Sequence, residues 1–279
     1  MGFVNWWQNI PANLDPVIFY LGSFPIRWYG TMYLVAFGTV YIMMNFRLKR
    51  KELEYDADFI GDAITWAILG VILGGRLGYV LFYNLGDFLQ EPWRILSPVA
   101  RINGSWRFTG ISGMSYHGGV IGIIIAWMIF ARRKGTSFFK LTDAIVPAGA
   151  LGYTFGRIGN FINGELYGRV TDSWIGMNWP GAGDNLLRHP SQLYEAFFEG
   201  VVLFAVLWYL RNRKLTPGVL TAIYIFGYGF FRFFIEYFRE PDAHLGLIVL
   251  NLSTGQLLCL AMMIGSTAFW YFGRQEVRT

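Results

Sequence analysis

Polar side chains interrupt an apolar run in the stretch GRIGNFINGELYGR, residues 156–169. They include Arg157, Asn160, Asn163 and Glu165. A charged side chain inside a bilayer costs about 3 kcal/mol or more, so it usually faces the protein interior, a partner or water. Arginine in that setting suits a phosphate ligand, because its planar guanidinium group donates paired hydrogen bonds to phosphate oxygens. The stretch therefore predicts a polar site near one membrane surface.

Two further arginines lie at a similar depth. Arg76, in LGGRLGYVLFYN, and Arg232, in FRFFIEYFRE, each come six or seven residues before the end of an apolar run. At about 1.5 Å per helical residue, they lie on the order of 10 Å below the surface that Arg157 approaches. Arg232 and Glu236 are four residues apart, so a structural ion pair on one helical face is the alternative. Three arginines at one depth favour a phosphate bound at the level of lipid head groups.

His117, in GMSYHGGVIG, begins another apolar run on the same side of the membrane. An imidazole is the usual proton carrier near neutral pH, which makes His117 a candidate base. Gly118 and Gly119 leave room beside it for a ligand or another backbone. The alternative is a hydrogen-bonded histidine at a helix start, with no chemical role. Tyr29, in RWYG, is interpreted from its position alone as an interfacial aromatic residue.

Other polar residues are interpreted as helix entries or loop positions. His189 precedes Pro190, and proline suits the first turn of a helix. Gln192 and Glu195 follow as side chains that could support the site, whereas His244 is expected on a solvated loop. No histidine pair and no aspartate cluster has the spacing of metal ligands, so neither a metal nor a cofactor is expected.

The composition is that of an integral membrane protein. Of the 279 residues, 54% are hydrophobic and only 15% are charged, and the mean hydropathy is +0.38. These values are too apolar for an ordinary soluble domain. The net charge of +5 is attributed to cytoplasmic loops, not to nucleic-acid binding. The single cysteine, Cys259, excludes an internal disulfide.

The pattern predicts an all-α membrane protein, a polytopic bundle of seven transmembrane helices in one transmembrane catalytic domain, residues 1–279. About 20 apolar residues are needed to cross a bilayer core. Of the predicted spans, the fourth is the weakest, because it contains Pro147 and several glycines, which are tolerated where neighbouring helices satisfy the backbone. The seven spans are expected at residues 24–46, 59–83, 114–131, 141–163, 191–210, 218–238 and 252–272.

Basic residues predict which side of the membrane each loop occupies. The clusters RLKRK, RRK and RNRK, and then Arg274 with Arg278, follow alternate spans and are expected in the cytoplasm. None of the five lysines falls in the outer loops 84–113, 164–190 and 239–251. The amino terminus is therefore expected outside and the carboxyl terminus in the cytoplasm, with a small periplasmic loop region. The buried arginines then lie in the outer half of the membrane.

Two other kinds of membrane protein could use such residues. GISG, residues 110–113, resembles the glycine-flanked serine of rhomboid intramembrane proteases, but spans four to seven contain no histidine to activate it. An anion or lipid transporter should carry polar groups through both halves of the membrane. The inner halves here, such as VIGIIIAWMIFA, carry no charge. The pattern favours chemistry confined to one leaflet.

Seven motifs in order resemble the prolipoprotein diacylglyceryl transferase family, over nearly the whole chain. The signature-like stretch is GRIGNFINGELYG, residues 156–168. The outer loop 170–188 matches no motif. The other matching motifs are RWYG, GGRLGYVLFYN, GMSYHGG, HPSQLYE, GYGFFRFFIEYFREPD and STGQ.

The resemblance implies a reaction at a bacterial inner membrane. The diacylglyceryl group of phosphatidylglycerol would pass to the lipobox cysteine thiol of a preprolipoprotein, forming a thioether and releasing glycerol phosphate. The active site would face the outer leaflet and the periplasmic side. GQLLC around Cys259 is no lipobox, so the acceptor cysteine must come from another protein.

The resemblance also implies which residues act. The residues expected to be catalytic are Tyr29, His117, Arg157 and Arg232. The residues expected to bind phosphatidylglycerol are Arg157, Asn160, Glu165, Gly168, Tyr228, Arg232, Glu236 and Arg239.

The chemistry of this reaction assigns roles within that set. The leaving group is a phosphate anion, which Arg157 and Arg232 would hold while Asn160 donates a neutral hydrogen bond. The pKa of a free thiol is too high for much thiolate at neutral pH, so His117 is a candidate general base. Alternatively, the arginines lower the thiol pKa and His117 only orients the lipid.

Overall fold

The protein is mostly helical, as the sequence predicts. The chain forms two compact units, one of residues 1–53 with 142–279 and the other of residues 54–141. Whether they act as the single domain expected above stays a prediction. The computed structural model describes residues 2–22, 24–83, 85–95, 97, 99–102, 105–108, 113–240, 247–249 and 252–276.

The first unit contains long helices at the predicted positions. The fifth predicted span is built from two α-helices joined by a π-helical segment, Ala196–Val202. The fourth span is continuous despite Pro147. Helix α6 belongs to this unit except for its first turn. The helices are α2 (Trp28–Lys49), α6 (Phe138–Ile162), α7 (Ser191–Glu195), α8 (Leu203–Leu210), α9 (Val219–Ile235) and α10 (Thr254–Glu276).

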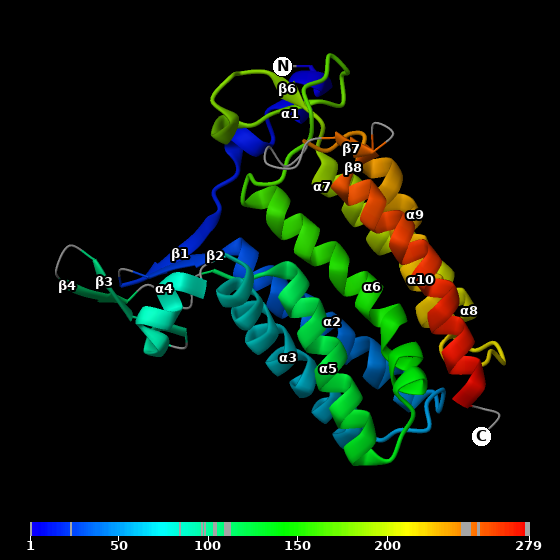
Figure 1. Ribbon diagram of the computed structural model, residues 1–279. Coiled ribbons are helices and arrows are strands. Elements are labelled where there is room, and N and C mark those ends of the chain that lie inside the picture. The colour runs from blue at the N-terminus through cyan, green and yellow to red at the C-terminus, as the bar shows by residue number, and fades with distance from the viewer. Residues whose placement is uncertain are drawn as a thin grey trace. The chain divides into compact units, whose positions relative to one another are not determined.

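Helices α6, α8 and α9 share an apolar core. Ala150 of α6 is buried with Leu203 and Leu207 of α8 and with Leu220 of α9. Helix α10 packs along α9, and α9 packs against α8 (Figure 1). This packing fixes α6 and α9, which carry Arg157 and Arg232.

Polar contacts close the end of these helices that is predicted to be cytoplasmic. Asp143 accepts hydrogen bonds of 2.8 Å from the backbone nitrogens of Gly218 and Thr221, and so caps the start of α9. Arg211 donates from Nε and Nη2 to both carboxylate oxygens of Glu52, at 3.0 and 3.2 Å. Glu52 also contacts Nε of the buried Arg47 at 3.4 Å. These contacts stabilise this end of the unit, and none of them involves a residue expected to be catalytic or to bind the lipid.

Helices α3 (Ala57–Tyr83) and α5 (Tyr116–Lys134) make up most of the second unit and pack closely along each other (Figure 1). Glycines permit the close approach. A Cβ on Gly74 would lie 2.4 Å from the carbonyl oxygen of Gly118, and one on Gly122 would lie 2.0 Å from that of Gly70. Side chains essentially never approach so closely, so only glycine fits at these crossings. The unit also contains α4 (Leu85–Gln90), β3 (Val99–Ile102) and β4 (Ser105–Phe108).

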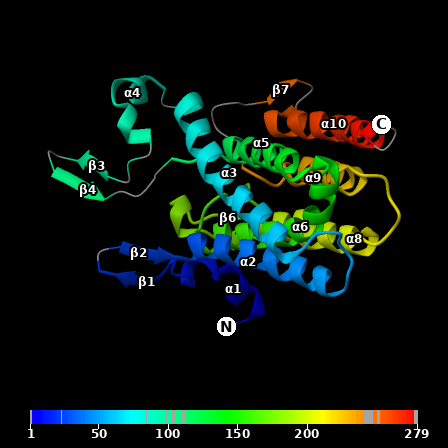
Figure 2. The same ribbon diagram turned by 90° about the horizontal axis from the view of Figure 1, so that it is seen from below.

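The expectation of an all-α protein was incomplete, because the described residues include four two-stranded antiparallel sheets. Because of one of these sheets, the first long helix starts later in the sequence than predicted. Residues 24–27, predicted to open the first span, form β2 (Phe24–Arg27) paired with β1 (Val17–Leu21). Pro25 lacks a backbone donor and disfavours helix at the residue before it, so α2 begins only at Trp28. Figure 2 shows this hairpin beyond the amino-terminal end of α2.

A small apolar core lies in the outer loop that matched no motif. Trp179 and Met177 are fully buried there against Phe161. The indole of Trp7 donates to the backbone oxygen of Ile175 at 3.0 Å and so ties α1 (Phe3–Gln8) to this loop. Trp179 is therefore a core residue of this loop. The short strands nearby are β5 (Met177–Asn178) and β6 (Leu187–Arg188), and the last pair is β7 (Leu247–Val249) with β8 (Leu252–Ser253).

Three helices in the described part of the chain are long and apolar enough to cross a membrane. They cover Ala57–Phe82, Ser191–Leu210 and Thr254–Gln275. Helix α9 is also apolar but has only 17 residues. The helices therefore agree with a membrane protein, while the count of seven spans stays a prediction.

The close contact of α3 with α5 predicts different effects for two glycines of the same helix. Gly74→Ala forces a Cβ into the Gly118 carbonyl, so we expect a loss of about 1–3 kcal/mol in the free energy of unfolding. Gly61→Ala is the matched control, because nothing lies within 4 Å of its Cβ and alanine favours helix by about 1 kcal/mol. Thermal unfolding in detergent would measure both. Equal melting temperatures for the two variants would contradict the tight contact.

Candidate active site

Arg157 lies near the end of α6, one turn after Tyr153. Its Nε is 2.7 Å from Oε2 of Glu195 and donates a 2.6 Å hydrogen bond to the hydroxyl of Tyr153. The guanidinium carbon lies 4.9 Å from the centre of the Tyr153 ring. Helical spacing of four residues places Tyr153 beneath Arg157. The predicted buried arginine is therefore held by an acid and an aromatic ring.

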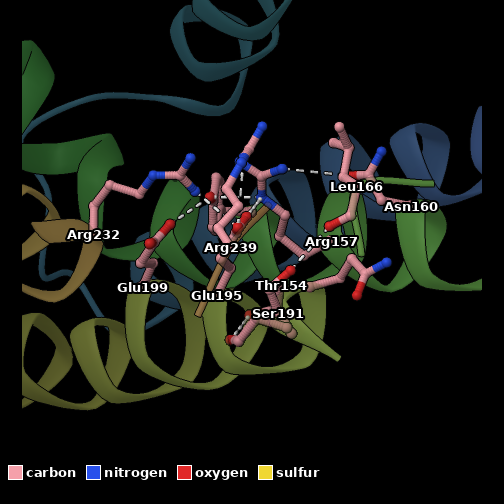
Figure 3. A network of polar contacts seen from close by, with 12 residues as sticks. Thr154, Arg157, Asn160, Leu166, Ser191, Glu195, Glu199, Arg232 and Arg239 are labelled. Carbon is pink, nitrogen blue, oxygen red and sulfur yellow. Dashed lines mark hydrogen bonds and ion pairs between the residues drawn. The ribbon is translucent and has the colours of Figure 1, made fainter. Parts of the chain in front are cut away.

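Arg232 and Arg239 meet the same acid from another helix. Arg232, in α9, places Nη1 2.8 Å from Oε1 of Glu195 and Nη2 3.3 Å from Oε2 of Glu236. Arg239, just beyond the end of α9, places Nη1 3.7 Å from the same Oε1. Three arginines from two helix ends therefore gather around one carboxylate (Figure 3).

Glu195 lies at the junction between α7 and the π-helical segment. Isolated π-helical turns occur frequently at functional sites. A Cβ on Gly200 would lie 2.0 Å from Oγ1 of Thr154 in α6, so this helix approaches α6 closely. That approach lets the hydroxyl of Tyr153 donate to Oε2 of Glu199 at 2.5 Å. The helix thus presents two buried acids, Glu195 and Glu199, to α6.

Asn160 and Glu165 continue the network into the loop after α6. Nη1 of Arg157 donates to Oδ1 of Asn160 at 3.4 Å, and Nδ2 of Asn160 donates to Oε1 of Glu165 at 2.8 Å. In the described part of the chain, Glu165 therefore pairs with an amide and not with an arginine.

The start of α7 holds this loop in place. Leu166 has φ of +59°, an uncommon conformation for a residue with a side chain that persists only where its surroundings enforce it. Ser191 Oγ donates to the Leu166 carbonyl at 2.9 Å, and Gln192 Nε2 donates to that of Glu165 at 2.6 Å. The motif HPSQLYE thus fixes the loop that carries Glu165.

Gly168 allows three backbone segments to cross. A Cβ there would lie 2.2 Å from the carbonyl oxygen of Phe238 and 2.8 Å from Cβ of His189. The Gly168 nitrogen donates to the His189 carbonyl at 2.8 Å, and Gly168 pairs with Arg239 in an antiparallel bridge. Gly168 thus has a geometric role that sets the position of the backbone at Arg239, while its expected binding of the lipid stays a prediction.

His189 is at the helix entry, as its sequence context predicts. Its Nδ1 lies 3.0 Å from the hydroxyl of Tyr194, and its ring packs on Phe238 at 5.1 Å between centroids. Burial lowers the pKa of the imidazole, so the ring is neutral at neutral pH. His189 therefore supports the close approach of the backbone segments at Gly168. His244 lies outside the described residues.

Two tyrosines of the expected set lie against the network. The ring of Tyr228 packs edge-on against Tyr153, with 5.7 Å between centroids. The hydroxyl of Tyr29 lies 3.1 Å from that of Tyr33. A Cβ on Gly159, the neighbour of Asn160, would lie 3.5 Å from Cα of Tyr29. Tyr228 is thus held beside Tyr153, and Tyr29 lies near the residues that follow Arg157.

Arg76 and His117 belong to the second unit. Arg76 donates to the carbonyl oxygens of Ile95 at 2.7 Å and Gly113 at 3.2 Å, so it binds backbone of its own unit. His117 is exposed in the first turn of α5, where the Ser115 side chain caps the helix by accepting from the Gly118 nitrogen. In the first unit, Arg239 joins Arg157 and Arg232. The estimate of membrane depth from the sequence did not include Arg239.

Sequence reasoning treated Glu195 only as a possible support and did not single out Tyr153 or Glu199. A signal was available for both acids, because they lie inside an apolar run. An ionisable residue in such a run marks a functional site by default.

The cluster can bind an anion. The side chains of Arg157, Arg232 and Arg239 are 13–15% exposed, whereas that of Glu195 is 1% exposed. Among the described residues, no hydrogen bond is donated by Nη2 of Arg157, Nε of Arg232 or Nε and Nη2 of Arg239. Arginine nitrogens of this kind match the oxygens of a phosphate.

Comparison with known proteins gives one consistent family. The family model described as prolipoprotein diacylglyceryl transferase matches residues 16–272. A phosphatidylglycerol–prolipoprotein diacylglyceryl transferase of Chlorobaculum tepidum is 54% identical, over 98% of this chain and 95% of its own length. Enzymes of the same name from Bordetella avium and Geobacter sulfurreducens are 47% and 45% identical, over 91% and 95% of this chain and 92% and 98% of their own lengths.

The crossing at Gly168 generates a test with a control from the same motif. Gly168→Ala must displace the Phe238 carbonyl, so we expect a loss of about 1–3 kcal/mol in the free energy of unfolding. Gly156→Ala should leave stability unchanged or raise it, since nothing lies within 4 Å of its Cβ. Thermal unfolding of both purified variants measures the difference. A Gly168→Ala protein as stable as Gly156→Ala would refute the proposed role of the glycine.

Proposed function

Because the chain belongs to the prolipoprotein diacylglyceryl transferase family and transfers the diacylglyceryl group of phosphatidylglycerol to a prolipoprotein, we propose that its arginine cluster binds the phosphate of that lipid. The observation that carries this proposal is the meeting of Arg157, Arg232 and Arg239 at Glu195. Their remaining N–H groups suit a phosphodiester at the depth of lipid head groups.

Arg157 and Arg232 act on the leaving group. The acceptor sulfur forms a bond to the terminal glyceryl carbon of the diacylglyceryl group, and the bond from that carbon to the phosphate oxygen breaks. The electron pair of the broken bond stays on the phosphate, which leaves as glycerol phosphate. Fixed guanidinium groups at this point offset the charge that develops in the transition state. Asn160, held by Glu165, orients Arg157.

His117 removes the thiol proton. A thiol is a weak nucleophile until it becomes a thiolate, and its ordinary pKa is too high for much thiolate at neutral pH. His117 is exposed and lies in the first turn of α5 beside Gly118 and Gly119, which carry no side chain. The proton then passes from the sulfur to the imidazole. The competing assignment, in which the arginines lower the thiol pKa and His117 orients the lipid, gives a different pH dependence.

The acceptor is the lipobox cysteine of a preprolipoprotein signal peptide. Cys259 of this chain is 3% exposed inside α10 and has no lipobox around it, which supports an acceptor from another protein. Tyr29, Tyr228 and Glu236 complete the lipid site. Tyr228 lies one turn before Arg232 in α9, and Glu236 lies one turn after it.

The family consists of membrane enzymes, and this chain crosses the bacterial inner membrane seven times. A helix lies at each of the seven predicted spans, which supports this topology. The positions of the basic clusters and lysines support an outside amino terminus and a cytoplasmic carboxyl terminus. The arginine cluster then faces the outer leaflet and the periplasmic side.

The comparisons do not support the two alternatives considered from the sequence, an anion or lipid transporter and a rhomboid-like protease. The serine proposed for the protease, Ser112, lies outside the described residues.

The direct test is to incubate the purified protein with phosphatidylglycerol and a lipobox peptide. Mass spectrometry should detect a diacylglyceryl adduct on the peptide cysteine. Arg157→Lys keeps the charge but loses the planar fork, so we expect kcat/KM to fall at least about 100-fold. Arg211→Lys alters a buried, ion-paired arginine at the other end of the unit and should stay close to wild type. No adduct from folded wild-type protein, or equal yields from Arg157→Lys and wild type, would overturn the proposal.

The role of His117 predicts a change in pH dependence. A general base must be unprotonated, so wild-type activity should rise with pH through the range in which histidine titrates. His117→Gln keeps a polar side chain but cannot accept the proton, so its activity should fall about 100-fold or more and lose that rise. The measurement is initial rate against pH for both proteins. Substantial residual activity with an unchanged pH profile would instead support the competing assignment.

A further inference from the structure

Glu195 is the residue on which the arginine cluster converges. Arg157 and Arg232 contact different oxygens of its carboxylate, at 2.7 and 2.8 Å, and Arg239 approaches Oε1 at 3.7 Å. Other acids in the network reach fewer of these arginines. Glu236 contacts only Arg232 among the described arginines and otherwise accepts from Ser253 Oγ at 3.2 Å.

The carboxylate lies behind the arginines. Its side chain is 1% exposed, whereas the three arginine side chains are 13–15% exposed. Figure 3 shows the guanidinium groups gathered on one side of the helix that carries Glu195 and Glu199. Each arginine directs at least one nitrogen to Glu195 and keeps others that donate no hydrogen bond in the described part of the chain. Glu195 therefore binds nitrogens on the inner edges of the three guanidinium groups. The nitrogens on their outer edges remain for a ligand.

The arginines also need such an acid before any lipid arrives. Three guanidinium groups crowded in a poorly solvated site repel one another, and a buried charge without a partner is strongly destabilising. Glu195 stands on a packed helix, tied to α6 by the contact of Gly200 with Thr154. A fixed carboxylate of this kind sets both the spacing and the direction of the arginines, which preorganises the site.

We propose that Glu195 is a positioning residue, which acts as the resident counter-ion and aims Arg157 and Arg232 at the phosphate of the donor lipid. This inference rests on the proposed function. Glu195 does not touch the reacting atoms, so it acts on the rate through the two arginines. A carboxylate among the arginines also weakens their attraction for the bound substrate.

These two effects predict an unusual kinetic signature. In Glu195→Gln, the amide keeps one acceptor oxygen but turns an NH2 group toward an arginine, so the two guanidinium groups lose their common anchor. We expect kcat to fall about 10- to 100-fold, because a misaligned arginine stabilises the leaving phosphate poorly. KM for phosphatidylglycerol should stay constant or fall, because no carboxylate competes with the phosphate. Glu195→Asp keeps the charge on a shorter side chain and should recover part of kcat.

Glu52→Gln is the matched control. Glu52 is a part-buried acid that also joins two arginines, Arg47 and Arg211, but it lies just beyond the carboxyl-terminal end of α2. Its loss should lower the melting temperature and leave kcat and KM near the wild-type values. The experiment measures kcat, KM for phosphatidylglycerol and the melting temperature for the full-length wild type and the three variants.

The outcomes separate the two proposals. Wild-type protein that folds but forms no adduct overturns the proposed function itself. An active wild type with unchanged kcat in Glu195→Gln, or with KM raised and kcat unchanged, overturns only the role of Glu195. If neither Glu195 variant folds while Glu52→Gln does, Glu195 is a structural residue and the inference fails. Lower kcat without higher KM, partly restored by aspartate, supports it.

Discussion

The burial of arginine beside lipid is the constraint on which the rest of the structure depends. A guanidinium group cannot be neutralised at any pH found in cells, so it needs a carboxylate, hydrogen-bond acceptors or a ligand around it. Glu195 meets this need for Arg157 and Arg232 at once. The ring and hydroxyl of Tyr153 add further contacts to Arg157. A site that attracts phosphate is therefore stable before the phosphate is bound.

Close helix packing makes this arrangement possible. Gly200 lets the helix that carries Glu195 and Glu199 approach α6, and Gly168 lets the backbone next to Arg239 cross the loop after α6. The start of α7 then holds that loop through Ser191 and Gln192. The site thus combines contacts from helix ends and from a loop, yet each part is fixed by backbone geometry. Rigid support of this kind keeps charged groups in position for transition-state stabilisation.

The proposed chemistry follows from the charges of the arginines and of the leaving phosphate. Transfer from phosphatidylglycerol produces a phosphate anion, which we propose the fixed arginines stabilise. Thiol activation is a separate task, which we assign to His117 under the same proposal.

The sequence by itself determined the helices and indicated candidate site residues, because apolar runs, basic clusters and seven ordered motifs depend on local order alone. It predicted Arg157 and Arg232 correctly as neighbours of one site, since helical rise converts sequence position into depth. The tertiary structure decided what holds them. Glu195 meets the arginines only after α6, α7 and α9 pack together, and Gly168 acts through atoms of Phe238 and His189, far along the chain. Depth along a helix can be counted from the sequence, but the direction a side chain faces is set by the neighbouring helices.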